Sequence, residues 1–241
     1  MVSQLPGSGW TLVSDNPHTT VAPAGWSTFT GGGEPNSGQT PPRIVSDPTA
    51  PDGDGSAVEY SYAGVGDGYE PQKSYVGFTS SSELYWATYV QWAPTWTWPA
   101  SSGFKQFIFG EGGPLGWFGT GRYQAAPFNG SNASVGRAAW DSNGFDEAPL
   151  LVTEPPLRTG QWYKLVLYLK VSPPQRVAAW INSGAGDVLI QDSAVNPGGT
   201  FNLGPTFINE LQFPATRGGG TPGPGLPGDT MRFARTVVYR R

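Results

Sequence analysis

Two neighbouring stretches, QWYKLVLYLKV and QRVAAWIN, carry aromatic, cationic and amide side chains at alternate positions, which share one face of an extended strand. The short connection SPPQ between them predicts a hairpin, and pairing brings these side chains onto one sheet surface. The side chains on that surface are Trp162, Lys164, Tyr168, Trp180 and Asn182. Because aromatic faces stack on sugar rings and Lys and Asn bind hydroxyls and carboxylates, the surface is a candidate sugar-binding groove. The alternative is a second layer of packing beneath a long loop.

A tryptophan-rich stretch, QWAPTWTWPASSG, raises a second question of binding or packing. Trp92 ends an extended run and shares a face with Trp86 and Val90, which predicts that it packs in the sheet. Prolines follow it and lack the N–H groups that a central strand needs, so a loop or edge segment is expected. We expect Trp96 to anchor this loop to the core. Trp98 is the candidate for an exposed contact with a ligand or another subunit.

The sequence offers few candidate metal ligands. Asp47, Asp52 and Asp54 lie in a Gly-rich loop and could supply oxygen ligands to Ca²⁺, but the loop lacks the terminal Glu of an EF-hand. Asp and Gly also form turns without any metal, which is the commoner arrangement. We expect no cofactor apart from a possible structural Ca²⁺. His18 is the sole histidine and sits in a polar segment, so we expect it to be exposed to solvent.

A glycosidase needs two carboxylates roughly 5–10 Å apart. Asp146 and Glu147 are adjacent and point to opposite faces of an extended chain, while Glu111 and Glu210 stand alone. Hydrolase chemistry is therefore disfavoured.

Composition and charge narrow the class of protein. The 241 residues include ten Trp, ten Tyr and twelve Phe, and the 35 Gly and 24 Pro separate apolar runs, as turn residues do in an all-β chain. A net charge of −4 argues against nucleic acid as a partner, because phosphate binding needs a basic surface. The lack of cysteine excludes disulfides and Cys-ligated metals.

Alternating or apolar runs predict an all-β fold with almost no helix. The expected strands are 9–13, 57–62, 74–78, 83–92, 104–109, 115–118, 121–125, 135–140, 161–171, 175–182, 187–192, 206–213 and 230–240. We expect a single domain, 1–241, in which residues 1–56 supply an N-terminal strand and long loops that pack on the sandwich.

No apolar run approaches the roughly 20 residues of a membrane span, so no membrane association is expected. The first residues show neither the charged nor the apolar region of a secretory signal. We therefore expect synthesis in the cytoplasm with release by lysis, or a shortened sequence, and a final location in the extracellular space or on a virion surface.

The order of four stretches resembles the concanavalin A-like lectin/glucanase superfamily. They are SSELYWATYVQWAPTW, SGFKQFIFGEG, GQWYKLVLYLKVSPPQRVAAWINSG and FINELQFPATRGGGTPGPGLPGDTMRFARTVVY. Within that superfamily the chain is most similar to jelly rolls of the alginate, glucuronan and heparin lyase type, including environmental and phage-encoded members. The resemblance implies two curved antiparallel sheets that form a β-sandwich with a concave face.

The resemblance also implies candidate catalytic residues. Such lyases take a proton from C5 of a uronic acid and neutralise the adjacent carboxylate, usually with Tyr and His or Lys, helped by Arg, Gln or Asn. Lys105 lies where the family often carries a strand lysine, and Arg122, Tyr123 and Gln124 follow in GRYQA. The histidine-bearing strand motif of alginate lyases is absent, which puts the activity in doubt. In the alternative, Lys105 is a surface lysine and Tyr123 a packing residue.

We therefore expect a non-catalytic jelly roll that binds a polysaccharide or cell-surface glycan. Such a protein could also decorate a larger assembly, as a homo-oligomer or beside capsid or tail proteins. The alternative is a polysaccharide lyase that cleaves uronic-acid glycans by β-elimination.

Overall fold

The structure is a computed structural model. It describes residues 7–29, 40–51, 55–64, 73–96, 103–105, 108–110, 113–120, 135–136, 138–142, 157–182, 186–194, 206–213, 216–218 and 226–241. Within these ranges every regular element is a β-strand, and all pairings are antiparallel. None of the residues so described forms a helix long and apolar enough to cross a membrane.

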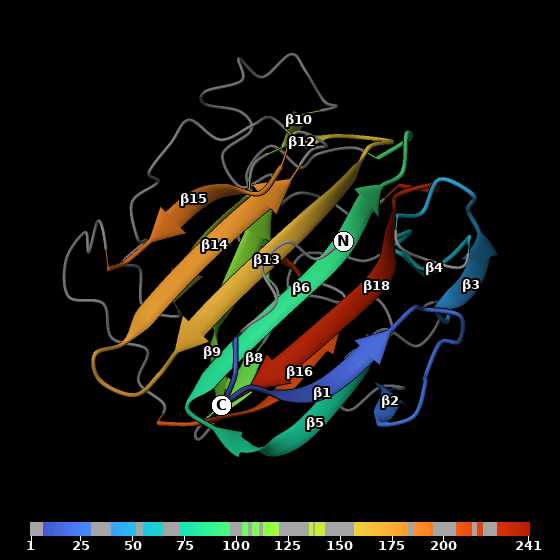
Figure 1. Cartoon of the computed structure of the whole chain (residues 1–241). Coiled ribbons are helices and arrows are strands. Elements are labelled where there is room, and N and C mark those ends of the chain that lie inside the picture. Colours follow the sequence, from blue (N-terminus) through green and yellow to red (C-terminus); the bar gives the residue numbers. More distant parts are fainter. Residues whose placement is uncertain are drawn as a thin grey trace.

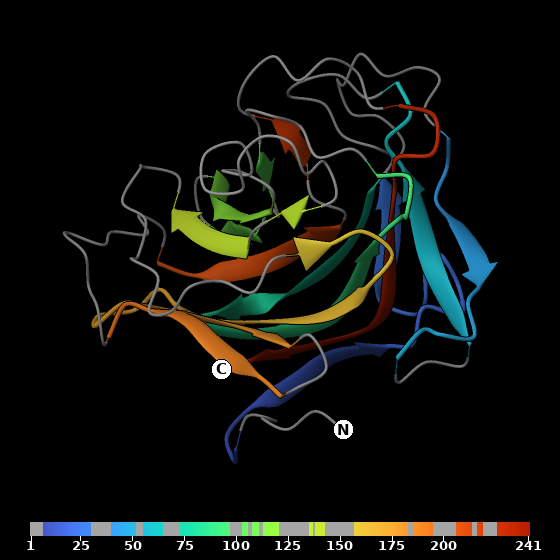
Figure 2. The same ribbon diagram turned by 90° about the horizontal axis from the view of Figure 1, so that it is seen from above.

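Two stacked sheets form the sandwich (Figures 1 and 2). The large sheet has eight strands, β1 (Thr11–Asn16), β3 (Arg43–Ser46), β4 (Ser56–Ser61), β6 (Glu83–Trp92), β13 (Trp162–Lys170), β14 (Arg176–Asn182), β15 (Val188–Asp192) and β18 (Thr230–Arg240). The small sheet has six, β2 (Trp26–Phe29), β5 (Lys73–Ser81), β8 (Ile108–Gly110), β9 (Gly113–Thr120), β11 (Ala138–Ser142) and β16 (Ile208–Phe213). Two short ribbons pair β7 (Gly103–Lys105) with β17 (Thr216–Gly218), and β10 (Val135–Gly136) with β12 (Leu157–Arg158).

The strand order of the large sheet is β15-β14-β13-β6-β18-β4-β3. One edge of β18 pairs with β6, and the other edge pairs with β4 along its first half and with β1 along its second. Figure 2 shows the β4 end of this sheet bending toward the small sheet, so the outer face of the large sheet is its convex side. The all-β sandwich predicted from the sequence is confirmed.

The strand predictions agree with the structure for the long alternating runs. Two runs that were each expected as one strand contain two, β7 and β8 in 104–109 and β10 and β11 in 135–140. The strands β2, β3, β12 and β17 were not expected, because each has only two to four residues and too few alternations to read. The run 121–125 lies outside the described residues.

The core lies between the sheets and is built largely from aromatic side chains. Trp86, Trp92 and Tyr163 are almost fully buried there. The predicted burial of Trp92 is confirmed, and so is the anchoring role of Trp96, whose ring packs edge-on against Tyr62 with centroids 5.2 Å apart. Trp98 lies outside the described residues.

The expectation that His18 is exposed is wrong. Its side chain is 2% exposed, and its Nε2 lies 2.8 Å from the hydroxyl of Thr236, which in turn lies 2.7 Å from the hydroxyl of Thr88. The backbone N–H of His18 donates to Asn16 Oδ1, and the Asn16 amide lies 3.1 Å from Nδ1 of the ring. Burial lowers the pKa of His18 to about 3. The ring therefore joins the N-terminal segment to the large sheet as a neutral group.

Candidate functional site

The predicted hairpin is present, and its register places the candidate ligand-binding residues on one face. Lys164 pairs with Asn182, Val166 with Trp180, and Leu165 with Ile181. Leu165 and Ile181 are buried in the core, so the residues of the opposite parity lie on the outer face of the large sheet. The shared surface predicted from the sequence is therefore this outer face.

Cross-strand pairing arranges the outer face in rows. One row runs across β14, β13, β6 and β18 through Asn182, Lys164, Tyr89 and Ala234. The next row runs through Trp180, Val166, Ala87, Val237 and Asp15. The small side chain of Ala87 lies between bulkier neighbours, which leaves the surface low at the centre of the sheet.

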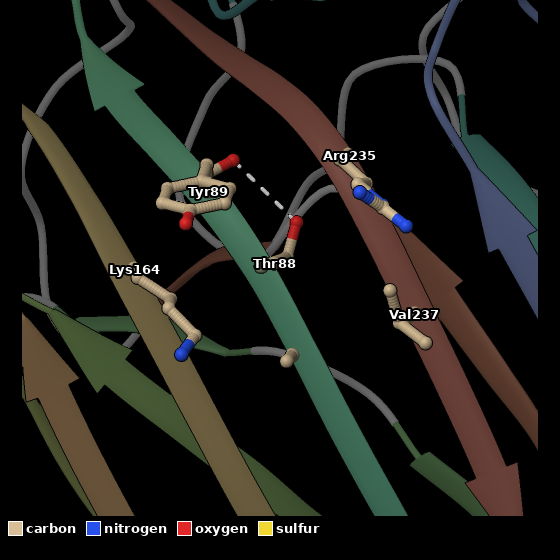
Figure 3. Close-up of a pocket in the computed structure, with 6 residues that line it drawn as sticks. Thr88, Tyr89, Lys164, Arg235 and Val237 are labelled. Atoms are coloured by element: carbon tan, nitrogen blue, oxygen red, sulfur yellow. Dashed lines mark hydrogen bonds between the residues drawn. The ribbon is translucent and has the colours of Figure 1, made fainter. Parts of the chain in front are cut away.

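A small depression, partly open to solvent, occupies this low point (Figure 3). It is lined by Ala87, Thr88, Tyr89, Lys164, Arg235 and Val237. Tyr89 is only partly buried, whereas Ala87 and Val237 are buried and form an apolar floor. The surface of the depression is almost wholly apolar, and the side chains of Lys164 and Arg235 border it.

Lys164 is held by a buried ion pair. Its ammonium donates to both carboxylate oxygens of Asp187, at 2.9 and 3.3 Å, and the two side chains are 4% and 6% exposed. The Asn182 amide donates to Asp187 Oδ1 at 3.0 Å. Two of the five predicted binding residues are thus linked through an aspartate that sequence reasoning missed.

Arg235 reaches the outer face because of a β-bulge. The register between β18 and β6 shifts between Ala234 and Thr236, and Arg235 is the extra residue. Its guanidinium makes a bidentate pair with Asp15 on β1, at 2.9 and 2.8 Å, and both side chains are partly exposed. No sequence pattern marks such a bulge. Tyr89, in contrast, could have been found from its outward parity in residues 83–92.

Trp162 lies in the row beyond Lys164, opposite Gln91. Its indole N–H donates to the hydroxyl of Thr49 at 3.2 Å, and the side chain is partly buried. The same row continues to Arg232 and then to Glu59. Trp162 is therefore placed at the border of the depression and not within it.

The row of Trp162 ends in a cluster of paired charges. The Glu59 carboxylate accepts hydrogen bonds from Arg43 at 2.7 Å and from Arg232 at 2.8 Å. Burial acts to raise the pKa of Glu59, but the hydrogen bonds and charges of the two arginines outweigh it and hold that pKa below its usual value. The two arginines thus stabilise the charged form of the Glu59 carboxylate.

Tyr168 and Trp180 pack in a second layer. Tyr168 lies between Trp10, edge-on at 6.1 Å, and the guanidinium of Arg176, 5.6 Å from its ring centroid. Trp180 packs with Trp10 against the cluster around Val166. These contacts agree with the packing alternative, except that Trp10, the residue just before β1, covers the two side chains. Their predicted role in ligand binding stays a prediction.

The Tyr168 hydroxyl donates to Glu83 at 2.8 Å, and Arg241 donates to both oxygens of the same carboxylate. Burial, followed by the hydrogen bond and charge of Glu83, raises the pKa of Tyr168 to about 12. The phenol therefore remains neutral at physiological pH and serves as a hydrogen-bond donor.

Of the three candidate calcium ligands, the structure describes only Asp47. Asp47 Oδ1 accepts hydrogen bonds from the N–H and hydroxyl of Thr49, and Oδ2 accepts one from Arg232 at 3.2 Å. These bonds describe a turn-forming residue. Asp52 and Asp54 lie outside the described residues, and within the described ranges no three acidic, His or Cys side chains form a metal-binding group.

Of the four candidate lyase residues, the structure describes only Lys105. Lys105 ends β7 and is paired with Thr216 of β17, while Arg122, Tyr123 and Gln124 lie outside the described residues. The strand β7 lies against β9, which ends just before Arg122. Lys105 is thus on a strand that does not belong to the large sheet.

Comparison with known proteins identifies the fold. No family model matches the sequence, and no curated protein matches it significantly. Among solved structures, alginate lyase Aly36B is 18% identical with a TM-score of 0.51 over 78% of this chain and 81% of that chain. A marine PL-14 alginate lyase from Aplysia kurodai is 12% identical, with a TM-score of 0.51 over 82% and 87% of the two chains.

Peanut lectin is 9% identical with a TM-score of 0.51 over 95% of this chain and 97% of that chain. The chain therefore has the jelly-roll fold that lyases and lectins share, which confirms the predicted concanavalin A-like architecture. Identity at this level establishes the fold alone.

Proposed function

We propose that this protein is a non-catalytic jelly roll that binds carbohydrate through the depression on the outer face of the large sheet. The observation that carries the proposal is the grouping of a partly exposed tyrosine, an apolar floor and two hydrogen-bonding charge pairs at one point of the sheet. The fold is shared with lectins and with enzymes that act on polysaccharides, which supports a carbohydrate ligand.

The chemistry of the depression suits a sugar ring. The face of Tyr89 and the methyl groups of Ala87 and Val237 offer apolar surface to the C–H groups of a pyranose. Arg235 offers N–H donors and Asp15 offers carboxylate acceptors, both partly exposed. The depression has room for no more than about one water molecule, so a sugar ring would lie on the surface over it and not within it.

The same contacts argue against glycoside hydrolysis at the depression. In the part of the chain that the structure describes, the carboxylates beside the depression are each committed to a cation, Asp187 to Lys164 and Asp15 to Arg235. Hydrolysis needs one carboxyl group free to give its proton to the leaving oxygen. The extracellular or virion setting stays a prediction from the sequence, tested by detecting the chain in purified particles.

The test is a panel of soluble glycans titrated into the protein by calorimetry, with Tyr89→Ala and Arg235→Gln as variants. We expect at least one glycan to bind and each variant to weaken it about tenfold, the equivalent of one or two lost contacts. Arg43→Gln is the matched control, because Arg43 is also a carboxylate-paired arginine of the large sheet but lies at its β3 edge. Binding that survives both variants contradicts the assigned site.

A second function, β-elimination on a uronic-acid glycan, is favoured by the position of Lys105. Its strand lies against β9, which leads toward Arg122. The assay is the ultraviolet absorbance of the unsaturated uronide with alginate, glucuronan and heparin as substrates. If the protein turns over one of these substrates and Lys105→Ala abolishes the turnover, the protein is a lyase and the non-catalytic proposal is contradicted.

A further inference from the structure

Among the described residues, the two cations that border the depression are each paired with a carboxylate. Lys164 is paired with Asp187 at 2.9 Å, and Arg235 with Asp15 at 2.8 Å, so the formal charges of these four groups cancel. The charged cluster in the next row is also balanced, with Arg43 and Arg232 around Glu59, and Asp47 paired with Arg232. The chain as a whole carries a net charge of −4.

We propose that the surface around the depression binds a neutral, hydroxyl-rich sugar unit and discriminates against uronates, because Lys164 and Arg235 are each already paired with a carboxylate of this chain. The proposal rests on the carbohydrate-binding function above and names the class of its ligand. A uronate carboxylate placed beside Arg235 lies close to Asp15, and placed beside Lys164 it lies close to Asp187. Like charges at such separations repel.

A neutral sugar has no such conflict. Each hydroxyl group both donates and accepts, so it bonds to an Arg235 N–H and to an Asp15 oxygen without displacing either partner. Charged groups form stronger hydrogen bonds than neutral ones, which makes a preformed ion pair a suitable partner for vicinal hydroxyls. The ring contacts with Tyr89, Ala87 and Val237 are independent of ligand charge.

Asp15→Asn provides a direct test, because it removes the negative charge beside Arg235 while keeping an oxygen acceptor at the same place. The Asp15–Arg235 pair is partly exposed, with side chains 39% and 36% accessible, so the variant is expected to fold normally. We expect the unchanged protein to bind a neutral glycan, such as a glucan, mannan, xylan or galactan, and to bind alginate and glucuronan at least tenfold more weakly.

Asp15→Asn should raise the affinity for alginate about tenfold at low ionic strength, and high salt should remove the gain, because exposed charges are screened. Its affinity for the neutral glycan should change less than about threefold. Glu83→Gln is the charge-matched control, since it releases Arg241 at the other end of β6. An equal alginate gain in Glu83→Gln assigns the effect to overall charge and overturns the proposal.

The remaining outcomes are also decisive. If alginate or glucuronan binds as tightly as every neutral glycan, the proposed ligand class is overturned, but the proposed carbohydrate binding still holds. If Tyr89→Ala and Arg235→Gln do not change the binding of the neutral glycan, the ligand binds elsewhere and the proposal is overturned. Failure to bind any glycan contradicts the proposed function itself, and the ligand class with it.

Discussion

Acidification should destabilise the protein through His18. The ring is 2% exposed and makes its contacts with Asn16, Thr236 and Trp26, none of which carries a charge. Desolvation therefore lowers the pKa of His18 to about 3 in the folded protein, against 6.5 for an unhindered histidine. The unfolded chain binds a proton at a pH where the folded protein does not.

Stability is consequently lost as the pH falls from about 6.5 toward about 3, and the loss is complete below the folded pKa. Each pKa unit corresponds to about 1.4 kcal/mol, so between pH 7 and pH 5 this single group removes about 2 kcal/mol from the free energy of unfolding. For a chain of this length such a loss lowers the melting temperature by about 4–8 °C.

Urea unfolding at the two pH values measures the effect, with His18→Gln as the variant. The glutamine amide can bond to Thr236 but does not titrate, so we expect its pH-dependent loss to be smaller by about 2 kcal/mol. His18 is the sole histidine, so NMR shows its imidazole as one resonance set, which should not shift between pH 7 and pH 5. A midpoint near 6.5 for that resonance, or an unchanged pH dependence in His18→Gln, refutes the reasoning.

Three further predictions concern the sheet and the tryptophan-rich stretch. Lys164→Met should lower the free energy of unfolding in urea by about 3–5 kcal/mol, because it leaves Asp187 buried without its cation. The double variant Lys164→Met with Asp187→Asn should recover at least half of that free energy. Equal losses in the single and double variants contradict the argument. Trp92→Ala should lower the free energy of unfolding by about 3–5 kcal/mol or unfold the protein, because the ring is completely buried. A loss of stability below about 1 kcal/mol refutes this prediction. Trp98→Ala should leave the melting temperature nearly unchanged while weakening glycan binding or assembly, and a large stability loss without a binding effect contradicts that assignment.

The register of the β13–β14 hairpin could be predicted because alternation fixes which residues share a face. Leu165 and Ile181 turn inward together, and Lys164 and Asn182 turn outward together, as the short connection requires. The core tryptophans Trp86 and Trp92 follow from the same parity on β6. Local patterns were sufficient wherever the partner strand was close in sequence.

The partners of the outer-face residues could not be predicted, because they come from distant parts of the chain. Arg235 meets Asp15 across 220 residues, and its direction depends on a bulge that leaves no mark in the hydrophobic pattern. His18 was misjudged for the same reason. Its neighbours in sequence are polar, yet its partner Thr236 comes from a strand 218 residues away.

The position of β18 also sets the order in which the large sheet can be assembled during synthesis. Its residues, Thr230–Arg240, lie between β6 on one side and β4 and β1 on the other, yet they are translated after all of these strands. Until they leave the ribosome, one edge of β6 has no partner and β1 has no strand to join. These strand edges therefore keep unpaired backbone groups until β18 is made, and such edges favour aggregation during synthesis.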